Sequence, residues 1–119
     1  MKIKTKNLIG PALDGLVARC LGVTVTYVRH NGWYETLDAR FAEPNDPHVF
    51  SPSTDWGQGG PIIEHESMKV QPFMHRNLWI AYIDKPYAHG DGPTPLIAAM
   101  RCYVASKLGD TVEIPEELA

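Results

Sequence analysis

The sequence predicts an α+β fold, a single-domain sandwich in which helices pack against an antiparallel or mixed sheet of about four strands. Residues 12–21 and 94–108 each place apolar side chains at helical spacing, which predicts two long helices. Shorter stretches rich in β-branched and aromatic residues, separated by turn residues, predict the strands. A chain of 119 residues suits one domain that buries a core, so we expect a single domain over residues 1–119.

Composition and charge narrow the functional classes. The chain is 44% hydrophobic and 21% charged, which is ordinary for a globular protein. Its formal net charge of −3 disfavours nucleic acid and anionic membranes as partners. No apolar run approaches the roughly 20 residues that span a bilayer, and Gly10 and Pro11 interrupt the only leader-like run. Because two cysteines cannot form a disulfide framework, we expect a cytoplasmic protein.

Three lysines alternate at the start of the chain. Residues 1–5 predict a short strand with Ile3 pointing inward, and Lys2, Lys4 and Lys6 would share its other face. No Arg or aromatic cluster adjoins these lysines in the sequence. We therefore interpret them as a solvated strand face rather than a phosphate-binding patch.

The first long helix and a hairpin follow. Pro11 suits the first turn of the helix, and Gly22 suits its left-handed end. Residues 23–29 predict a strand, and an Asn-Gly turn signal joins it to a return strand over residues 33–37. Residues 38–52 hold three prolines and predict a surface loop.

Residues 51–64, called the signature stretch below, combine hydroxyls, a carboxylate, an indole, an amide and three glycines. We predict one turn over residues 54–56, with Ser51 or Ser53 as its cap. The glycines then predict a break, and a short third helix follows over residues 61–66.

The second half of the chain alternates strands and loops before its long helix. Residues 68–73 and 78–84 predict two strands, and both faces of the second are apolar, as in a central strand covered on two sides. The Gly and Pro content of residues 85–95 predicts a second loop. Residues 111–114 predict a last short strand.

The helix over residues 94–108 has clear ends. Thr94 is its predicted cap, Pro95 takes its first position and Gly109 follows its end. The helix is apolar nearly all round, which predicts a buried helix with two packing faces, one of them available to a subunit interface. Arg101 is its only charge before the last turn, so we expect Arg101 to reach the rim and meet a carboxylate.

Two blocks, residues 51–64 and 92–109, closely resemble the phage NinX-like proteins, and part of the first helix matches the same pattern. The resemblance covers essentially the whole chain as one NinX-like domain, although residues 38–49 and 65–88 match more loosely. It implies a phage or prophage protein that is expressed inside a bacterial host cell. It carries over no catalytic or ligand-binding residue.

Known motifs do not explain the signature stretch. Its glycines lack the Gly-Lys-Ser/Thr ending of a P-loop, and no clear strand precedes them as a dinucleotide fingerprint requires. An anion site at the amide groups of residues 59–62 stays open. Residues 64–66 read Glu-His-Glu but lack the second His of the helical zinc motif. We predict no metal and no cofactor, and interpret Cys20 and Cys102 as inert core thiols.

Trp56 has two interpretations. Its indole either fills the core beside the predicted break or forms a stacking wall with Tyr87 or Tyr34 for a planar ligand. In the second case the loop over residues 85–95 is the opposite lip of a shallow cleft. The predicted ligand-binding residues around that cleft are Asp55, Trp56, Gln58, Gly59, Gly60, Glu64 and Arg101.

Three functional hypotheses follow. The first is a non-catalytic phage accessory protein that binds a host or phage protein and forms a homo-oligomer, most simply a dimer. The second is a small-molecule binder that sequesters a nucleotide-like signal used in host defence. The third is a small hydrolase that uses Asp55, His65 or Glu66.

Overall fold

The computed structural model describes residues 1–29, 32–35, 49–73, 77–85 and 87–118, and it confirms the α+β class. Over these residues three α-helices pack with three small antiparallel sheets, the largest of three strands, where the sequence predicted about four strands in one sheet. No helix of the described residues is long and apolar enough to cross a membrane.

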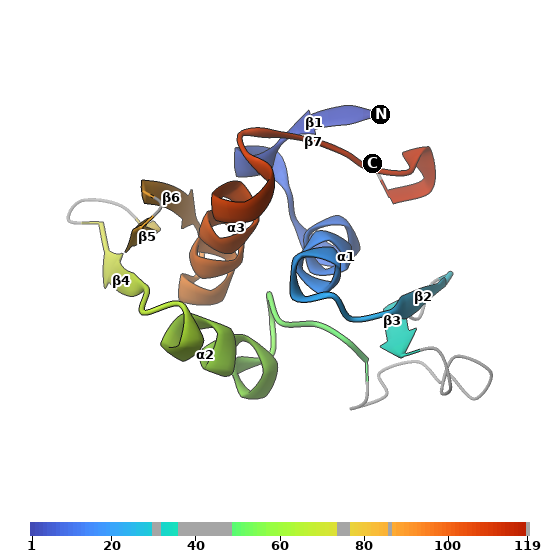
Figure 1. Cartoon of the computed structure of the whole chain (residues 1–119), viewed down its shortest axis with the longest axis horizontal. Helices are drawn as coiled ribbons and strands as arrows, with labels where there is room; N and C mark the ends of the chain where they lie inside the picture. The colour runs from blue at the N-terminus through green and yellow to red at the C-terminus, as the bar shows by residue number, and fades with distance from the viewer. Residues whose placement is uncertain (30–31, 36–48, 74–76, 86, 119) are drawn as a thin grey trace.

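The element order is as follows. The helices are α1 (Gly10–Leu21), α2 (Trp56–His65) and α3 (Pro95–Leu108), with short 3₁₀ turns η1 (Thr5–Asn7) and η3 (Glu116–Leu118). The three sheets pair β1 (Lys2–Lys4) with β7 (Thr111–Glu113), β2 (Val25–Val28) with β3 (Gly32–Glu35), and β4 (Lys69–Pro72) with β5 (Trp79–Asp84) and then β6 (Tyr87–Gly92). The β1–β7 pair places the two ends of the chain side by side. α3 lies between the β4–β5–β6 sheet and α1, and the β2–β3 pair lies beyond α1 (Figure 1).

The ends of the two long helices confirm the predictions from the sequence. Pro11 lies in the first turn of α1, and Gly22 ends the helix with a left-handed φ of 75°. The Thr94 hydroxyl accepts a hydrogen bond from the Ile97 N–H at 3.1 Å, a cap worth about 1 kcal/mol. Gly109 follows α3 with a φ of 87°.

α3 is the buried helix that the sequence predicted. One side packs on β5 and β6, and another packs on α1 (Figure 1). Both predicted packing faces are therefore largely occupied within the chain. The buried residues of α3 are Leu96, Ile97, Ala98, Ala99, Met100, Cys102, Tyr103 and Val104.

The loop predicted over residues 85–95 is wrong, because most of it is strand β6. The side chains of β6 alternate between exposed and buried, and Ala88, Gly90 and Gly92 take the buried face against α3. A Cβ at Gly90 would lie 2.6 Å from the Ala98 carbonyl oxygen on α3. The glycines that predicted a turn are thus the small residues that allow a strand and a helix to approach closely.

The break predicted within the signature stretch is also wrong. α2 is one continuous helix from Trp56 to His65, and its cap is Asp55 rather than Ser51 or Ser53. Pro61 lies inside it and cannot bond the carbonyl of the residue four positions before. That residue is Gly57, which is exposed, so water can satisfy its carbonyl and the helix continues.

The remaining strands match the predictions from the sequence, except that β5 is not covered on both of its faces by the described residues. β2 and β3 form the predicted hairpin, and β4 and β5 form the next one, while the loop residues 36–48 lie outside the described residues. β5 is central in its sheet, as predicted. Its inner face meets α3, whereas Ile80 and Tyr82 on the outer face are only half-buried. Within the described residues no helix covers that outer face.

Candidate functional site

The polar side chains of the signature stretch bind one another and the adjacent backbone. One carboxylate oxygen of Asp55 accepts from the Gly57 N–H at 2.8 Å, and the other accepts from Nε2 of Gln58 at 3.0 Å. Gln58 Oε1 accepts from the Ser51 N–H at 2.9 Å, and its Nε2 also donates to the Val49 carbonyl at 2.8 Å. These groups hold the entry to α2, and little of their hydrogen-bonding capacity is left for a ligand.

A buried carboxyl ties the same stretch to α1. Oδ1 of Asp14 accepts from the Ser53 N–H at 2.9 Å, and both residues are buried. Burial raises the pKa of Asp14 from 3.8 to about 6, although the Ser53 hydrogen bond opposes the shift. Asp14 is not among the residues predicted for a site, because nothing local in the sequence shows that a helix carboxyl meets a backbone amide 39 positions away.

The other predicted residues of the stretch have separate surroundings. A Cβ at Gly59 would collide with the Pro52 carbonyl and lie 2.6 Å from Cδ2 of Leu96, so Gly59 allows α2 to pack closely. Gly60 has open space around it, and Glu64 is exposed. None of these three therefore has a position that singles it out for ligand contact.

The interpretation of Trp56 as a core residue is wrong, because its side chain is 56% exposed. It lines a small hollow of about 210 Å³ beside the start of α3. Tyr34 is fully buried, so it cannot form an exposed stacking wall with Trp56. Tyr87 is exposed, but it does not line the hollow that Trp56 lines.

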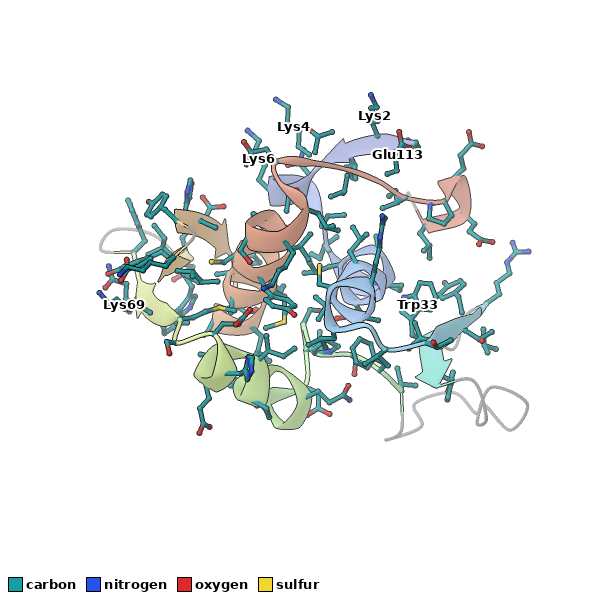
Figure 2. The ribbon with its side chains drawn as sticks, viewed as in Figure 1. Lys2, Lys4, Lys6, Trp33, Lys69 and Glu113 are labelled. Atoms are coloured by element: carbon teal, nitrogen blue, oxygen red, sulfur yellow. The ribbon has the colours of Figure 1, made fainter. Side chains whose placement is uncertain are left out.

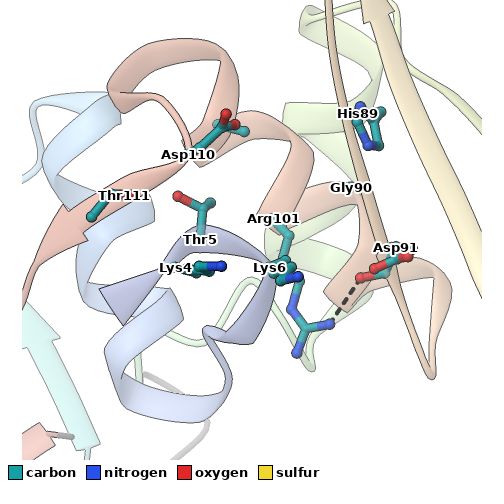
Figure 3. A pocket seen from close by; sticks show the side chains of 10 residues that line it. Lys4, Thr5, Lys6, His89, Gly90, Asp91, Arg101, Asp110 and Thr111 are labelled. Atoms are coloured by element: carbon teal, nitrogen blue, oxygen red, sulfur yellow. Dashed lines mark hydrogen bonds between the residues drawn. The ribbon is translucent and has the colours of Figure 1, made fainter. Parts of the chain in front are cut away.

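Arg101 lies in a different and larger cavity, of about 480 Å³ (Figure 3). Its Nε donates to the Leu8 carbonyl at 2.7 Å, and its Nη1 donates to the Asp91 carbonyl at 2.8 Å. The predicted contact with a carboxylate is thus replaced by two backbone carbonyls. The residues that line this cavity are Lys4, Thr5, Lys6, His89, Gly90, Asp91, Arg101, Ala105, Asp110 and Thr111.

The cavity collects positive charge from both ends of the chain. Lys4 and Lys6 come from β1 and η1, at the end of the molecule where Lys2 also projects (Figure 2). Within the described residues neither lysine forms an ion pair with a carboxylate. Burial lowers the pKa of Arg101, and the nearby Asp91 opposes that shift. The cavity therefore holds one partly desolvated cation and two lysines without a carboxylate partner.

This arrangement overturns the reason for treating the lysines as a plain solvated face. That interpretation depended on the lack of a neighbouring Arg, and the fold brings Arg101 to them from α3. The Thr5 hydroxyl donates to the Gly109 carbonyl at 2.6 Å, and the Thr5 N–H donates to the Asp110 carbonyl at 2.8 Å. These two bonds fix η1 against the end of α3, and Lys4 and Lys6 line the same cavity as Arg101.

A model of the family described as Bacteriophage P22, NinX matches residues 4–107. The chain belongs to this family. The match includes the signature stretch and the cavity residues from Lys4 to Ala105, while Asp110 and Thr111 of the cavity lie beyond it. No curated protein matches the chain.

This NinX family chain also has an apolar groove, of about 390 Å³, between the end of α1, α2 and α3. Leu21 is 42% exposed at its edge, and Glu66 on its rim lies 3.4 Å from Nζ of Lys107. Gln58 lines this groove and Arg101 does not, so the predicted site residues do not share one cavity. The groove is lined by Leu21, Phe50, Gln58, Pro61, Ile62, His65, Glu66 and Tyr103.

The pKa values of the two cysteines in this NinX family chain support their interpretation as core thiols. Burial raises the pKa of Cys102 to about 12 and also raises the pKa of Cys20, so both thiols stay protonated and weakly nucleophilic. In the described parts of the chain, no three His, Cys, Asp or Glu side chains are grouped as metal ligands would be.

Proposed function

We propose that this NinX family protein binds a small anionic ligand in the cavity lined by Lys4, Lys6 and Arg101. One observation carries the proposal: three cationic side chains from distant parts of the chain line one cavity, and no described carboxylate forms an ion pair with them. The cavity volume of about 480 Å³ falls within the range of roughly 300–1,000 Å³ that is usual for small-molecule sites.

The way in which Arg101 is held supports this proposal. An arginine has five N–H donors, and two of those of Arg101 are used by the carbonyls of Leu8 and Asp91. The guanidinium is thereby fixed in place while three donors and the full charge remain. A fixed guanidinium loses little conformational entropy when it binds an anion, and its charged hydrogen bonds are stronger than neutral ones.

The two acidic residues of the cavity limit what it accepts. Asp91 and Asp110 line the same space as the cations, so the local charge is only modestly positive. Their carboxylates repel a densely charged anion but accept hydrogen bonds from hydroxyl or amino groups. A ligand with one anionic group and several hydrogen-bond donors suits this mixture best.

Calorimetry with inorganic phosphate, ribose 5-phosphate and citrate tests the proposal. We expect at least one of these anions to bind, and the Lys4→Ala/Lys6→Ala double variant to bind it at least about tenfold more weakly. The matched control is Lys2→Ala, because Lys2 is exposed on the same strand and does not line the cavity. The proposal fails if none of the anions binds, or if the double variant binds as tightly as the control.

A second candidate function is self-association through the apolar groove, which is the dimer form of the first hypothesis from the sequence. The half-exposed Leu21 and the apolar walls of the groove favour it, since buried apolar surface drives protein association. In sedimentation experiments we expect Leu21→Asp to shift the chain toward monomer. Ile9→Asp is the control, because Ile9 is 56% exposed and lies outside the groove. A wild-type chain that stays monomeric at all concentrations contradicts this candidate.

The hydrolase hypothesis has no comparable support. Asp55 caps the start of α2 and His65 ends it, ten residues further along. A helix rises about 1.5 Å per residue, so these two groups lie about 15 Å apart and cannot act on one bond. His65 Nδ1 lies 3.3 Å from Oε2 of Glu66 at the groove rim. We propose that the ligand-binding function lies in the cationic cavity. We also propose that the protein works inside the bacterial host cell.

A further inference from the structure

The cationic cavity continues into a strip of aromatic side chains on the outer face of β6. His89 lines the cavity, and Tyr87 lies two residues before it on the same face of the strand. The Tyr87 and His89 rings have centroids 6.1 Å apart and an interplanar angle of 37°. The Tyr87 side chain is 71% exposed. A surface of two aromatic rings, tilted toward each other, therefore begins where the cationic cavity ends.

The rest of this face leaves the two rings accessible. α3 covers the opposite face of β6, at Ala88, Gly90 and Gly92. On the neighbouring strand Tyr82 pairs with His89 in register and is half-buried, which extends the aromatic surface sideways. Lys69 on β4 is paired with Asp84 at 3.7 Å and lies 5.4 Å from the centre of the Tyr82 ring.

We infer that the ligand is a mononucleotide, with its phosphate at Lys4, Lys6 and Arg101 and its base stacked on His89 and Tyr87. This inference rests on the proposed function and names its ligand class. His89 joins the two halves, since it lines the cavity and contacts the Tyr87 ring. Asp91 is the next residue on the same face of β6 and also lines the cavity, where its carboxylate can accept hydrogen bonds from ribose hydroxyls.

Charge decides between a mononucleotide and a nucleic-acid strand. A strand presents a phosphate at each nucleotide, whereas the aromatic strip lies beside Asp84 and Asp91, and Lys85, in the turn before β6, is separate from the three cations of the cavity. The formal net charge of −3 adds a general repulsion. The surface therefore offers one place for a phosphate and one for a base.

The test compares ribose 5-phosphate, AMP, adenosine and a short single-stranded oligoadenylate by calorimetry on the intact chain. Stacking on an aromatic side chain should make AMP bind at least about fivefold more tightly than ribose 5-phosphate. Tyr87→Ala should remove this preference and leave the affinity for ribose 5-phosphate unchanged, while Tyr87→Phe should keep it. Because Tyr87 is exposed, these variants should fold as the wild type does. Trp56→Ala is the control, since Trp56 is an exposed aromatic residue that does not line this cavity.

The outcomes separate the inference from the proposed function. If ribose 5-phosphate and AMP bind equally well, the aromatic strip is not a base site, and anion binding at the cavity stands alone. If AMP keeps its preference in Tyr87→Ala and loses it in Trp56→Ala, the base lies at the signature stretch and the inference is overturned. If the oligoadenylate binds more tightly than AMP, the ligand class is a strand and the inference is equally wrong. If AMP and all three anions of the earlier test, inorganic phosphate, ribose 5-phosphate and citrate, fail to bind, the proposed function fails as well.

Discussion

The signature stretch and the cationic cavity differ in how far their polar groups are satisfied. In the stretch, Asp55 and Gln58 bind each other and the adjacent backbone amide and carbonyl groups. In the cavity, Lys4 and Lys6 have no ion-pair partner among the described residues, and Arg101 is held only by carbonyls. Both regions are rich in polar groups. In the stretch, Asp55 and Gln58 are satisfied and the unpartnered Ser53 Oγ is buried, whereas the lysines of the cavity are exposed to a ligand.

This difference shows why the density of reactive residue types is a poor guide to a site. Side chains that satisfy one another contribute to stability, because a buried polar group without a partner costs about 1–3 kcal/mol. Side chains that remain unsatisfied near a cavity contribute little to folding, and their free hydrogen bonds are the ones a ligand can use. The comparison therefore predicts opposite effects on stability and on binding for substitutions in the two regions.

The largest expected effect is at Gly59 in the signature stretch. A methyl group there would meet the Pro52 carbonyl and the Leu96 side chain, so Gly59→Ala should lower the free energy of unfolding by about 2–3 kcal/mol in urea denaturation. Gly60→Ala is the matched control. Its added methyl has open space, and alanine favours a helix, so this variant should gain about 0.5–1 kcal/mol. Equal effects at both positions would contradict a structural role for the stretch.

The next effect depends on pH and comes from Asp14, which anchors the stretch to α1. The folded-state pKa of about 6 lies above the ordinary 3.8, so the folded form favours the protonated carboxyl. This contribution to stability is present below about pH 4 and is lost as the pH rises through 6. Asn keeps an oxygen for the Ser53 N–H without the charge, so Asp14→Asn should be more stable than wild type at pH 8 by about 2–3 kcal/mol.

Urea denaturation of both proteins between pH 4 and pH 8 checks this prediction. The quantity to follow is the difference in unfolding free energy between wild type and Asp14→Asn, since every other titrating group is common to both. That difference should grow as the pH rises from 4 to above 6 and then level off. Two parallel pH profiles would show that Asp14 is not the buried acid that the geometry indicates.

The smallest expected effect on stability is in the cationic cavity. The Lys4→Ala/Lys6→Ala double variant removes two like charges that lie near Arg101. We expect its unfolding free energy to stay within about 0.5 kcal/mol of wild type, because exposed charges contribute little to folding. Thermal denaturation at low and high salt measures this. A loss of stability comparable to that of Gly59→Ala would place the lysines with the structural residues and remove the contrast between the two regions.

Local signals in the sequence determined the elements whose ends depend on neighbouring residues. Thr94 and Gly109 frame α3 as predicted, and Pro11 and Gly22 frame α1, because caps and left-handed turns are set by adjacent positions. The apolar pattern of α3 predicted its burial correctly, and residues 68–73 and 78–84 were predicted as the strands that are β4 and β5. Two blocks of residues also carried the resemblance to the NinX family, which the family match confirms.

Only the tertiary structure decided the role of the glycines and the composition of the cavity. A glycine in a turn and a glycine beneath a packed helix look the same in sequence, so Gly90 in β6 was assigned to a loop. Gln58 was predicted as a ligand contact, and its partners Val49 and Ser51 become visible only when the chain folds back. Asp55 instead binds the nearby Gly57 N–H and Gln58 as the cap of α2. Lys4 and Arg101 line one cavity because a buried helix brings them together across the length of the chain, and no local pattern records such a contact.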